Sequence, residues 1–346
     1  MRVGMTLNYS GGFSETVTGL VDYERAGLDI IYVPEAYSFD AVSQLGYIAA
    51  RTERLELASG ILQIYTRTPA LTAMTAAGLD FVSGGRFTLG IGASGPQVIE
   101  GFHGVPYTAP LGHTRELVEI CRMVWRRERV EYRGEHYTLP LPDGPGKALT
   151  LTVHPVREQI PIYLAAVGPK NLELAGEIAD GWLAVFYSAE FASESLAQVA
   201  AGRSKVGKTL EGFDVVPTAP LVVGDDWQAA ADAVRPYASL YVGGMGSRDK
   251  NFYNNLACRM GFEAEAAEVQ DKFLAKDYPG AMAALPVEFL DATSLLGPVE
   301  RIADSMQALA GAGVTTLTVS PMHFDLDLNV KALRAAAEAL DKSGVA

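Results

Sequence analysis

The clearest chemical feature of the sequence is the junction Val167-Gly168-Pro169-Lys170-Asn171, where an apolar strand gives way to a helix. Pro169 at the first helical position removes an N–H that would have no intrahelical acceptor, and the N–H groups of Lys170 and Asn171 are predicted to stay free. Free amides and the positive end of the helix dipole favour an anion such as a phosphate. The alternative interpretation is a plain helix start with a solvated lysine.

Glycines gather at the end of another strand, in GIGASG at 90–95. This stretch nearly fits a dinucleotide-binding fingerprint, but Pro96 occupies the last position and no helix is expected to start at once. The alternative is that Gly90 and Gly92 let a strand end bend.

Other catalytic patterns are weak. The five histidines, at positions 103, 113, 136, 154 and 323, lack metal-ligand spacing, so no metal site is predicted. The sequence has no GxSxG motif, which argues against a serine hydrolase. A cofactor-free lyase or isomerase would need a lysine or paired carboxylates at strand ends, and we find Glu35 alone there.

These residues are positioned by apolar runs that alternate with helices. Helices are predicted at about 14–26, 40–52, 68–84 and 113–127, and from Pro169 onward. Gly27 is expected to end the first of them in a left-handed conformation, and Thr68 is expected to cap the third. Strands are predicted at 2–7, 29–34, 55–60, 87–92, 161–166, 181–186, 215–223 and 315–320. Continuous apolar strands indicate burial on both faces, as in a parallel sheet. Eight such units predict a closed (β/α)8 TIM barrel, with an open doubly wound sheet as the alternative.

Two insertions interrupt this alternation within a single domain that spans residues 1–346. One covers about 128–158 and is rich in turn-forming residues, and the other covers about 243–290 and looks helical. Long insertions in barrels usually lie near the active face, so we expect both of them there.

Composition limits the classes of partner. The net charge of −13 argues against binding to nucleic acid or to anionic membranes. No apolar run reaches the roughly 18 residues of a membrane span, and the first residues do not resemble a secretory signal. The two cysteines do not suggest a disulfide framework. We therefore expect a cytoplasmic enzyme that acts on a small molecule.

Three blocks of the sequence resemble the luciferase-like monooxygenase superfamily. ASGILQIYTRTPALTAMTAAGLDFVSGGRFTLGIG, at 58–92, looks like the family signature, and AAVGPKNLELAGEIADGW, at 165–182, is similar to its cofactor-phosphate loop. With GASGPQVIEGFHG, at 92–104, they resemble the branch that uses the deazaflavin coenzyme F420 and includes methylenetetrahydromethanopterin reductase and F420-dependent glucose-6-phosphate dehydrogenase. The resemblance implies a TIM barrel and is weak at both insertions.

The resemblance also implies where the cofactor binds. The coenzyme phosphate is expected at the Val167–Asn171 loop, and a cis peptide bond between Gly60 and Ile61 is expected to bulge against the back of the deazaflavin ring. Without the resemblance, Gly60 would read as a strand terminus. The residues implied to bind the cofactor are Gly60, Ile61, Gln63, Ala93, Ser94, Val167, Gly168, Lys170 and Asn171.

The implied catalytic residues match the family less well. Glu35 stands where related sugar-phosphate dehydrogenases carry an aspartate, but Ala36 replaces their proton-donating histidine and Gly95 replaces their glutamate base. Glu100 and His103 are the nearby candidates to move protons, although a lone histidine is more often structural.

The sequence thus predicts a coenzyme F420-dependent oxidoreductase that transfers a hydride between deazaflavin C5 and an unidentified organic substrate. An FMN-dependent monooxygenase on the same scaffold is the first alternative, and the cofactor-free lyase or isomerase is the second. Because relatives are commonly dimers, we expect a homodimer through the second and third helices, which carry Tyr47, Ile48, Leu71 and Met74.

Overall fold

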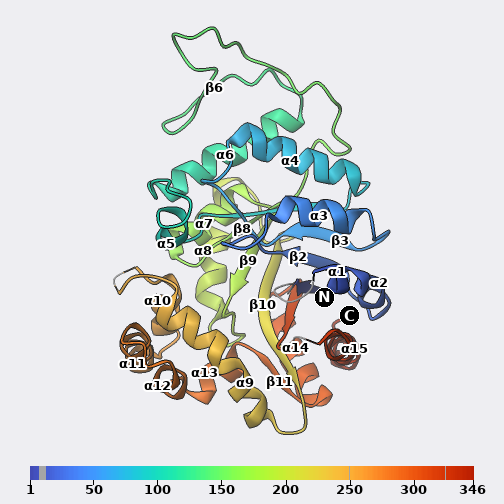
Figure 1. Ribbon diagram of the computed structural model, residues 1–346, viewed down its shortest axis with the longest axis vertical. Helices are drawn as coiled ribbons and strands as arrows, with labels where there is room; N and C mark the ends of the chain where they lie inside the picture. Colours follow the sequence, from blue (N-terminus) through green and yellow to red (C-terminus); the bar gives the residue numbers. More distant parts are fainter. Residues whose placement is uncertain (8–12, 249, 324) are drawn as a thin grey trace.

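Eight parallel strands close into a barrel in the computed structural model, which describes residues 1–7, 13–248, 250–323 and 325–346 (Figure 1). The last strand pairs with the first, with Leu317 opposite Val3. In order around the barrel, the strands are β1 (Arg2–Thr6), β2 (Ile30–Val33), β3 (Glu56–Ser59), β5 (Phe87–Gly92), β8 (Ile162–Ala165), β9 (Gly181–Val185), β10 (Asp214–Val223) and β12 (Thr316–Pro321). The closed barrel is therefore confirmed, and the open doubly wound sheet is wrong.

The barrel interior is filled by side chains and closed at its amino-terminal end. One packed layer consists of Ile30, Tyr32, Ala58, Tyr163 and Val216. Below it, Arg2 donates hydrogen bonds to Glu56 and Asp214, both at 2.9 Å. Because these three residues lie at or beside strand starts, their ion pairs close the end of the barrel opposite the loops that follow the strands.

Helices cover the outside of the barrel. These are α1 (Phe13–Thr18), α2 (Leu20–Arg25), α3 (Ala41–Ala49), α4 (Pro69–Val82), α6 (Pro110–Trp125), α7 (Pro169–Ile178), α8 (Ala192–Lys205), α9 (Trp227–Ser239), α14 (Val299–Gly311) and α15 (Leu326–Ser343). The Thr68 hydroxyl accepts from the Leu71 N–H at 3.2 Å, so Thr68 caps α4 as predicted. None of the helices in the described ranges combines the length and the hydropathy that a membrane crossing requires.

Local predictions fail at two helices. The helix expected at 14–26 is divided into α1 and α2 at Gly19, where an added Cβ would lie 2.6 Å from Leu326. A one-turn helix, α5 (Pro96–Ile99), begins directly after the glycine cluster, although no helix was expected there. Two short strands were also missed: β4 (Leu62–Gln63), which pairs with β5, and β11 (Leu295–Gly297), which pairs with β10.

The second insertion is helical, as predicted. It contains α10 (Phe252–Arg259), α11 (Glu263–Leu274), α12 (Tyr278–Ala283) and α13 (Val287–Ala292), and it follows a π-helical turn, η1 (Leu240–Gly244). Asp249, which belongs to this insertion, lies outside the described residues. Buried side chains of α10 to α13 pack with α9 and Phe186 into a separate core, so the insertion forms a firm layer beside the barrel.

The first insertion does not lie at the active face, and this prediction is wrong. It contains a small hairpin, β6 (Tyr132–Arg133) and β7 (Thr138–Leu139), and extends outside α4 and α6 (Figure 1). The buried Glu116 carboxylate of α6 accepts the N–H groups of residues 135–137. These bonds hold the hairpin turn on the outer side of α6, because a helix that follows a barrel strand runs back along the outside of the barrel.

We expect Asp80→Ala to lower the free energy of unfolding by about 3 kcal/mol. Asp80 in α4 is fully buried and accepts the Arg157 Nε–H at 3.0 Å, so its loss would leave a half-buried guanidinium without a counter-ion. Urea denaturation followed by circular dichroism measures the change. Glu338→Ala, which removes an exposed partner of Lys342, is the control and should cost less than about 1 kcal/mol. Equal losses in the two variants would contradict this account.

Candidate active site

A cavity of about 740 Å³ opens at the carboxyl ends of the barrel strands. Ligand sites in proteins commonly measure roughly 300–1,000 Å³, so the space suits a cofactor-sized molecule. The residues that line it at or after strand ends include Thr6, Pro34, Gly60, Gly92, Ala165 and Val185. The barrel therefore brings together segments that are far apart in the sequence.

All nine residues that were expected to bind a cofactor line this cavity. They come from three segments, which follow β3, β5 and β8 in the chain. The residues are Gly60, Ile61, Gln63, Ala93, Ser94, Val167, Gly168, Lys170 and Asn171. Their common location agrees with the prediction, while their contacts with a cofactor stay a prediction.

The segment after β3 lies close against β5. The Gly60–Ile61 peptide bond is cis, as the resemblance implied. A Cβ added at Gly92 would lie 2.7 Å from Ile61 Cδ1, and one added at Gly90 would lie 1.9 Å from the Ser59 carbonyl oxygen. Gly90 and Gly92 are therefore needed for the close approach of the two segments, and they do more than bend a strand end.

The loop before α7 offers fewer free amides than expected. Gly168 is the N-cap and Pro169 the first helical residue, as predicted. However, the Asn171 N–H donates to the Gly168 carbonyl at 3.0 Å, and its side-chain Nδ2 donates to the Ala165 carbonyl at 3.3 Å. The prediction of a free Asn171 amide is therefore wrong, because the first turn of α7 closes tightly. The N–H groups of Gly168 and Lys170 remain available as donors to an anion.

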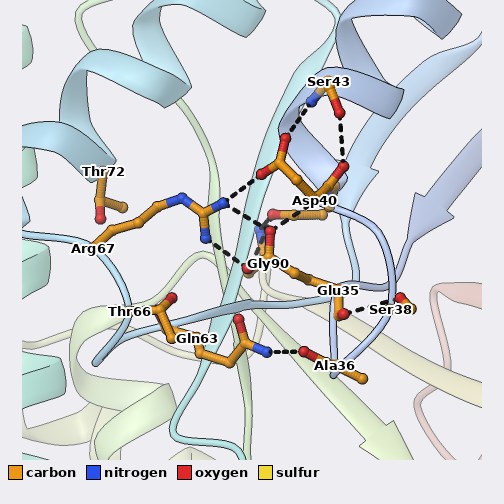
Figure 2. A network of polar contacts seen from close by, with 12 residues as sticks. Glu35, Ala36, Ser38, Asp40, Ser43, Gln63, Thr66, Arg67, Thr72 and Gly90 are labelled. Atoms are coloured by element: carbon orange, nitrogen blue, oxygen red, sulfur yellow. Dashed lines mark hydrogen bonds and ion pairs between the residues drawn. The ribbon is translucent and has the colours of Figure 1, made fainter. Parts of the chain in front are cut away.

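Glu35 lines the cavity, but both of its carboxylate oxygens are bound by the chain. Arg67 donates from Nη1 to Oε1 at 2.6 Å and from Nη2 to Oε2 at 2.7 Å, and the Ala41 N–H at the start of α3 donates to Oε2 at 3.1 Å. Figure 2 shows the same guanidinium reaching Asp40, at 2.8 Å. The hydrogen bonds with Glu35 raise the pKa of Arg67 against the effect of burial, so this group stays charged.

The ion pair sets the position of a neighbouring amide. The loop from Glu35 to Asp40 is held at both ends by Arg67, and the Gln63 Nε2 donates to the Ala36 carbonyl within it at 2.9 Å (Figure 2). This bond orients the Gln63 amide so that its other atom, Oε1, is left to accept a hydrogen bond. Glu35 thus acts on the cavity by positioning Gln63, and a direct role in proton transfer stays a prediction.

Three buried polar atoms in the cavity wall have no hydrogen-bond partner in the part of the chain that the structure describes. They are Gln63 Oε1, the Tyr32 hydroxyl and Thr318 Oγ1. Burial, with smaller contributions from Tyr163 and Asp214, raises the pKa of Tyr32, so its hydroxyl stays protonated and able to donate. Because an unsatisfied buried polar group is costly, these three atoms are available to form hydrogen bonds with a ligand in the cavity.

Glu100 and His103 do not line the cavity with the other candidates. Glu100 Oε1 accepts the Tyr107 N–H at 3.0 Å, and the His103 ring packs edge-on against Phe102 at 5.1 Å. Glu100 therefore supports the backbone of Tyr107, which does line the cavity. A proton-transfer role for either residue stays a prediction.

Sequence reasoning missed the aromatic part of the cavity wall. Tyr107, Tyr241, Phe252 and Tyr253 line it, the last three from η1 and α10. It also missed the role of Arg67, although the arginine–x–proline pattern was part of the family resemblance. The aromatic run in NFYNN at 251–255 was the available signal for Phe252 and Tyr253.

Known proteins resemble the chain over nearly its whole length. A family model described as luciferase-like monooxygenase matches residues 1–316. The chain is 39% identical to the Mycobacterium tuberculosis protein Rv3520c, whose name describes a coenzyme F420-dependent oxidoreductase, over 92% of this chain and 95% of that one. It is 30% identical to the 5,10-methylenetetrahydromethanopterin reductase of Archaeoglobus fulgidus, over 87% and 88%.

A solved structure has the same fold. The coenzyme F420-dependent tetrahydromethanopterin reductase of Methanopyrus kandleri superposes with a TM-score of 0.84 at 24% identity, covering 99% of each chain. The barrel and its cavity agree with the family match over residues 1–316. The chain belongs to the luciferase-like monooxygenase family.

Proposed function

We propose that the chain is a coenzyme F420-dependent oxidoreductase that acts on a small organic substrate. The observation that carries the proposal is a single cavity that joins the amino-terminal end of α7 to the Ile61 and Gln63 segment after β3. The names of its relatives in Mycobacterium tuberculosis and Archaeoglobus fulgidus support the same cofactor and reaction class. When bound, the deazaflavin supplies a hydride acceptor or donor at its C5.

The polar groups of the cavity fit such a cofactor. A deazaflavin ring carries carbonyl oxygens and a ring N–H, and the wall offers the unpartnered acceptor Gln63 Oε1 with the hydroxyl donors of Tyr32 and Thr318. The cofactor side chain carries a phosphate, and the N–H groups of Gly168 and Lys170 at the start of α7 can hold an anion. Apolar residues such as Ile61 line the same cavity.

The chain contributes positioning and exclusion of water. Ile61 lies against Gly92 and forms a firm apolar surface on one side of the cavity. The Glu35–Arg67 pair holds the Gln63 amide, which orients a ring that bonds to it. We assign Glu35 a positioning role, because both carboxylate oxygens are already engaged by the guanidinium.

The first test of the function is cofactor choice. We expect coenzyme F420 to bind at low micromolar concentration or tighter, and FMN to bind at least about tenfold more weakly, a difference of about 1.4 kcal/mol. Equilibrium dialysis of the purified protein against each cofactor measures both dissociation constants. Tight binding of FMN without binding of coenzyme F420 would favour the monooxygenase alternative and overturn the proposal.

The second test concerns the loop before α7. A Cβ at Gly168 would meet no atom within 4 Å, so Gly168→Val should fold normally while its side chain occupies the space beside the Lys170 N–H. We expect cofactor affinity to fall by about tenfold or more, and to fall less in Lys170→Ala, because backbone amides hold the anion. Gly224→Val is the matched control, since its Cβ is equally free and it lies outside the cavity lining. An unchanged dissociation constant in folded Gly168→Val would place the phosphate elsewhere.

We also propose a homodimer that forms through the outer faces of α3 and α4, which lie next to each other in Figure 1. Tyr47, Leu71 and Met74 are 41%, 48% and 55% exposed, which leaves an apolar surface on these helices. Ile48 was expected to belong to it, but it is fully buried and packs in the core. Helix geometry explains the difference, because adjacent residues 47 and 48 point about 100° apart.

The double variant Leu71→Glu, Met74→Glu should therefore be monomeric, because four carboxylates would be brought together across the interface. Light scattering at micromolar concentration should give twice 36.9 kDa for the original chain and 36.9 kDa for the variant. Val206→Glu, an exposed apolar site outside α3 and α4, is the control and should stay dimeric. A monomeric original chain would overturn the dimer proposal without affecting the proposed reaction.

A further inference from the structure

The second insertion contributes an aromatic wall to the cavity, which consists of Tyr241, Phe252 and Tyr253. The rings of Tyr241 and Tyr253 meet edge-on at 4.9 Å. Phe186, which follows β9, lies behind both, at 5.8 Å from Tyr241 and 6.2 Å from Tyr253. The wall therefore rests on the core of the insertion and on the barrel at once.

Two buried asparagines fix this wall in place. Asn251 Nδ2 donates to the carbonyls of Tyr241 and Val242 at 3.1 and 2.9 Å, and its Oδ1 accepts the N–H groups that start α10, including that of Tyr253 at 3.0 Å. Asn254 Nδ2 donates to the Val242 and Ala266 carbonyls at 3.1 and 2.7 Å. These bonds tie the backbone of α10 to η1 and α11, and the ring contacts with Phe186 hold Tyr241 and Tyr253 in position.

The described residues that line the cavity offer little charge to a substrate. Among the described residues that line it, Glu35 and Lys170 are the charged ones. Glu35 is neutralised by Arg67, and Lys170 lies in the first turn of α7, where the proposed function places the cofactor phosphate. A charged substrate group against the aromatic wall would lose its hydration and gain no counter-ion there, which costs several kcal/mol.

Two exposed aromatic rings lie beside a segment of the cavity lining. Tyr37 and Phe102 are 61% and 67% exposed, and their rings are 6.4 Å apart. Tyr37 follows Ala36, which lines the cavity, and Phe252 of the aromatic wall is itself partly exposed.

From this arrangement we infer that the substrate is an uncharged, largely apolar molecule that packs against Tyr241, Phe252 and Tyr253. The inference rests on the proposed function, which assigns the other side of the cavity to the cofactor. A hydroxyl of the wall can donate one hydrogen bond to a neutral acceptor on the substrate, and burial raises the pKa of Tyr253 so that its hydroxyl stays protonated. Among the described residues the aromatic wall has no cation to pair with a phosphate or a carboxylate, so we expect sugar phosphates and carboxylic acids to bind against it more weakly.

The test compares two probes that share one aromatic enone and differ in charge, benzylideneacetone and the carboxylate benzylidenepyruvate. Equilibrium dialysis against protein saturated with oxidised coenzyme F420 gives both dissociation constants without turnover. We expect the neutral probe to bind at least about tenfold more tightly, because its carboxylate analogue must bury a charge. Equal binding, or failure of the neutral probe to bind, would overturn the inference.

A pair of lysine variants shows whether this preference comes from the aromatic wall. Phe252→Lys places a cation at a partly exposed position of the wall and should improve binding of benzylidenepyruvate by about fivefold or more while weakening benzylideneacetone. Leu274→Lys, at a similarly exposed site of α11 outside the cavity lining, should change neither value. An identical response of the two variants would show that the probes bind elsewhere and would overturn the inference.

Repeating the dialysis without coenzyme F420 separates this inference from the proposed function. One outcome is that the protein fails to bind coenzyme F420 and still prefers the neutral probe, with Phe252→Lys removing that preference. In that case the proposed function is wrong, and the inference that the aromatic wall favours neutral molecules is supported. If coenzyme F420 binds and the anionic probe is preferred, the function stands and the inference fails.

Discussion

The cavity depends on the ion pair between Arg67 and Glu35, whose side chains are only 13% and 9% exposed. This contact ties the loop after β2 and the start of α3 to the segment after β4, and it orients Gln63 through Ala36. A pair so removed from water is costly to break on one side, by roughly 3–5 kcal/mol, because a buried charge is left behind. The same contact offsets the charge of Glu35, so Lys170 is the charged residue that remains among the described residues lining the cavity.

The two sides of the cavity differ in origin and in chemistry. The barrel supplies buried polar atoms and the amino-terminal end of α7, which suit a polar ring with a phosphorylated side chain. The second insertion supplies the aromatic wall and carries its own core behind it. That core and the hydrogen bonds of Asn251 support the aromatic wall from behind.

Local patterns in the sequence predicted local structure well where one contact decides the outcome. Thr68 caps α4, Pro169 begins α7 and Gly27 ends the helix before β2 with a φ of 99°. Predictions from local patterns failed where a contact with a distant segment decides the structure. Gly19 divides the first predicted helix where it meets Leu326, and residues 135–137 bind Glu116 instead of approaching the cavity.

The sequence by itself determined the alternation of apolar strands and helices, and hence the closed barrel with a cavity at the carboxyl ends of its strands. It also located nine residues that line this cavity, because family motifs are contiguous in the chain, while their contacts with a cofactor stay a prediction. Only the tertiary structure decided that Glu35 is held by Arg67, that Glu100 and His103 lie outside the cavity, and that aromatic rings of the insertion complete it. The physical reason is that a side chain's partner is set by three-dimensional packing between distant segments, and hydrophobic periodicity carries no information about which loops meet.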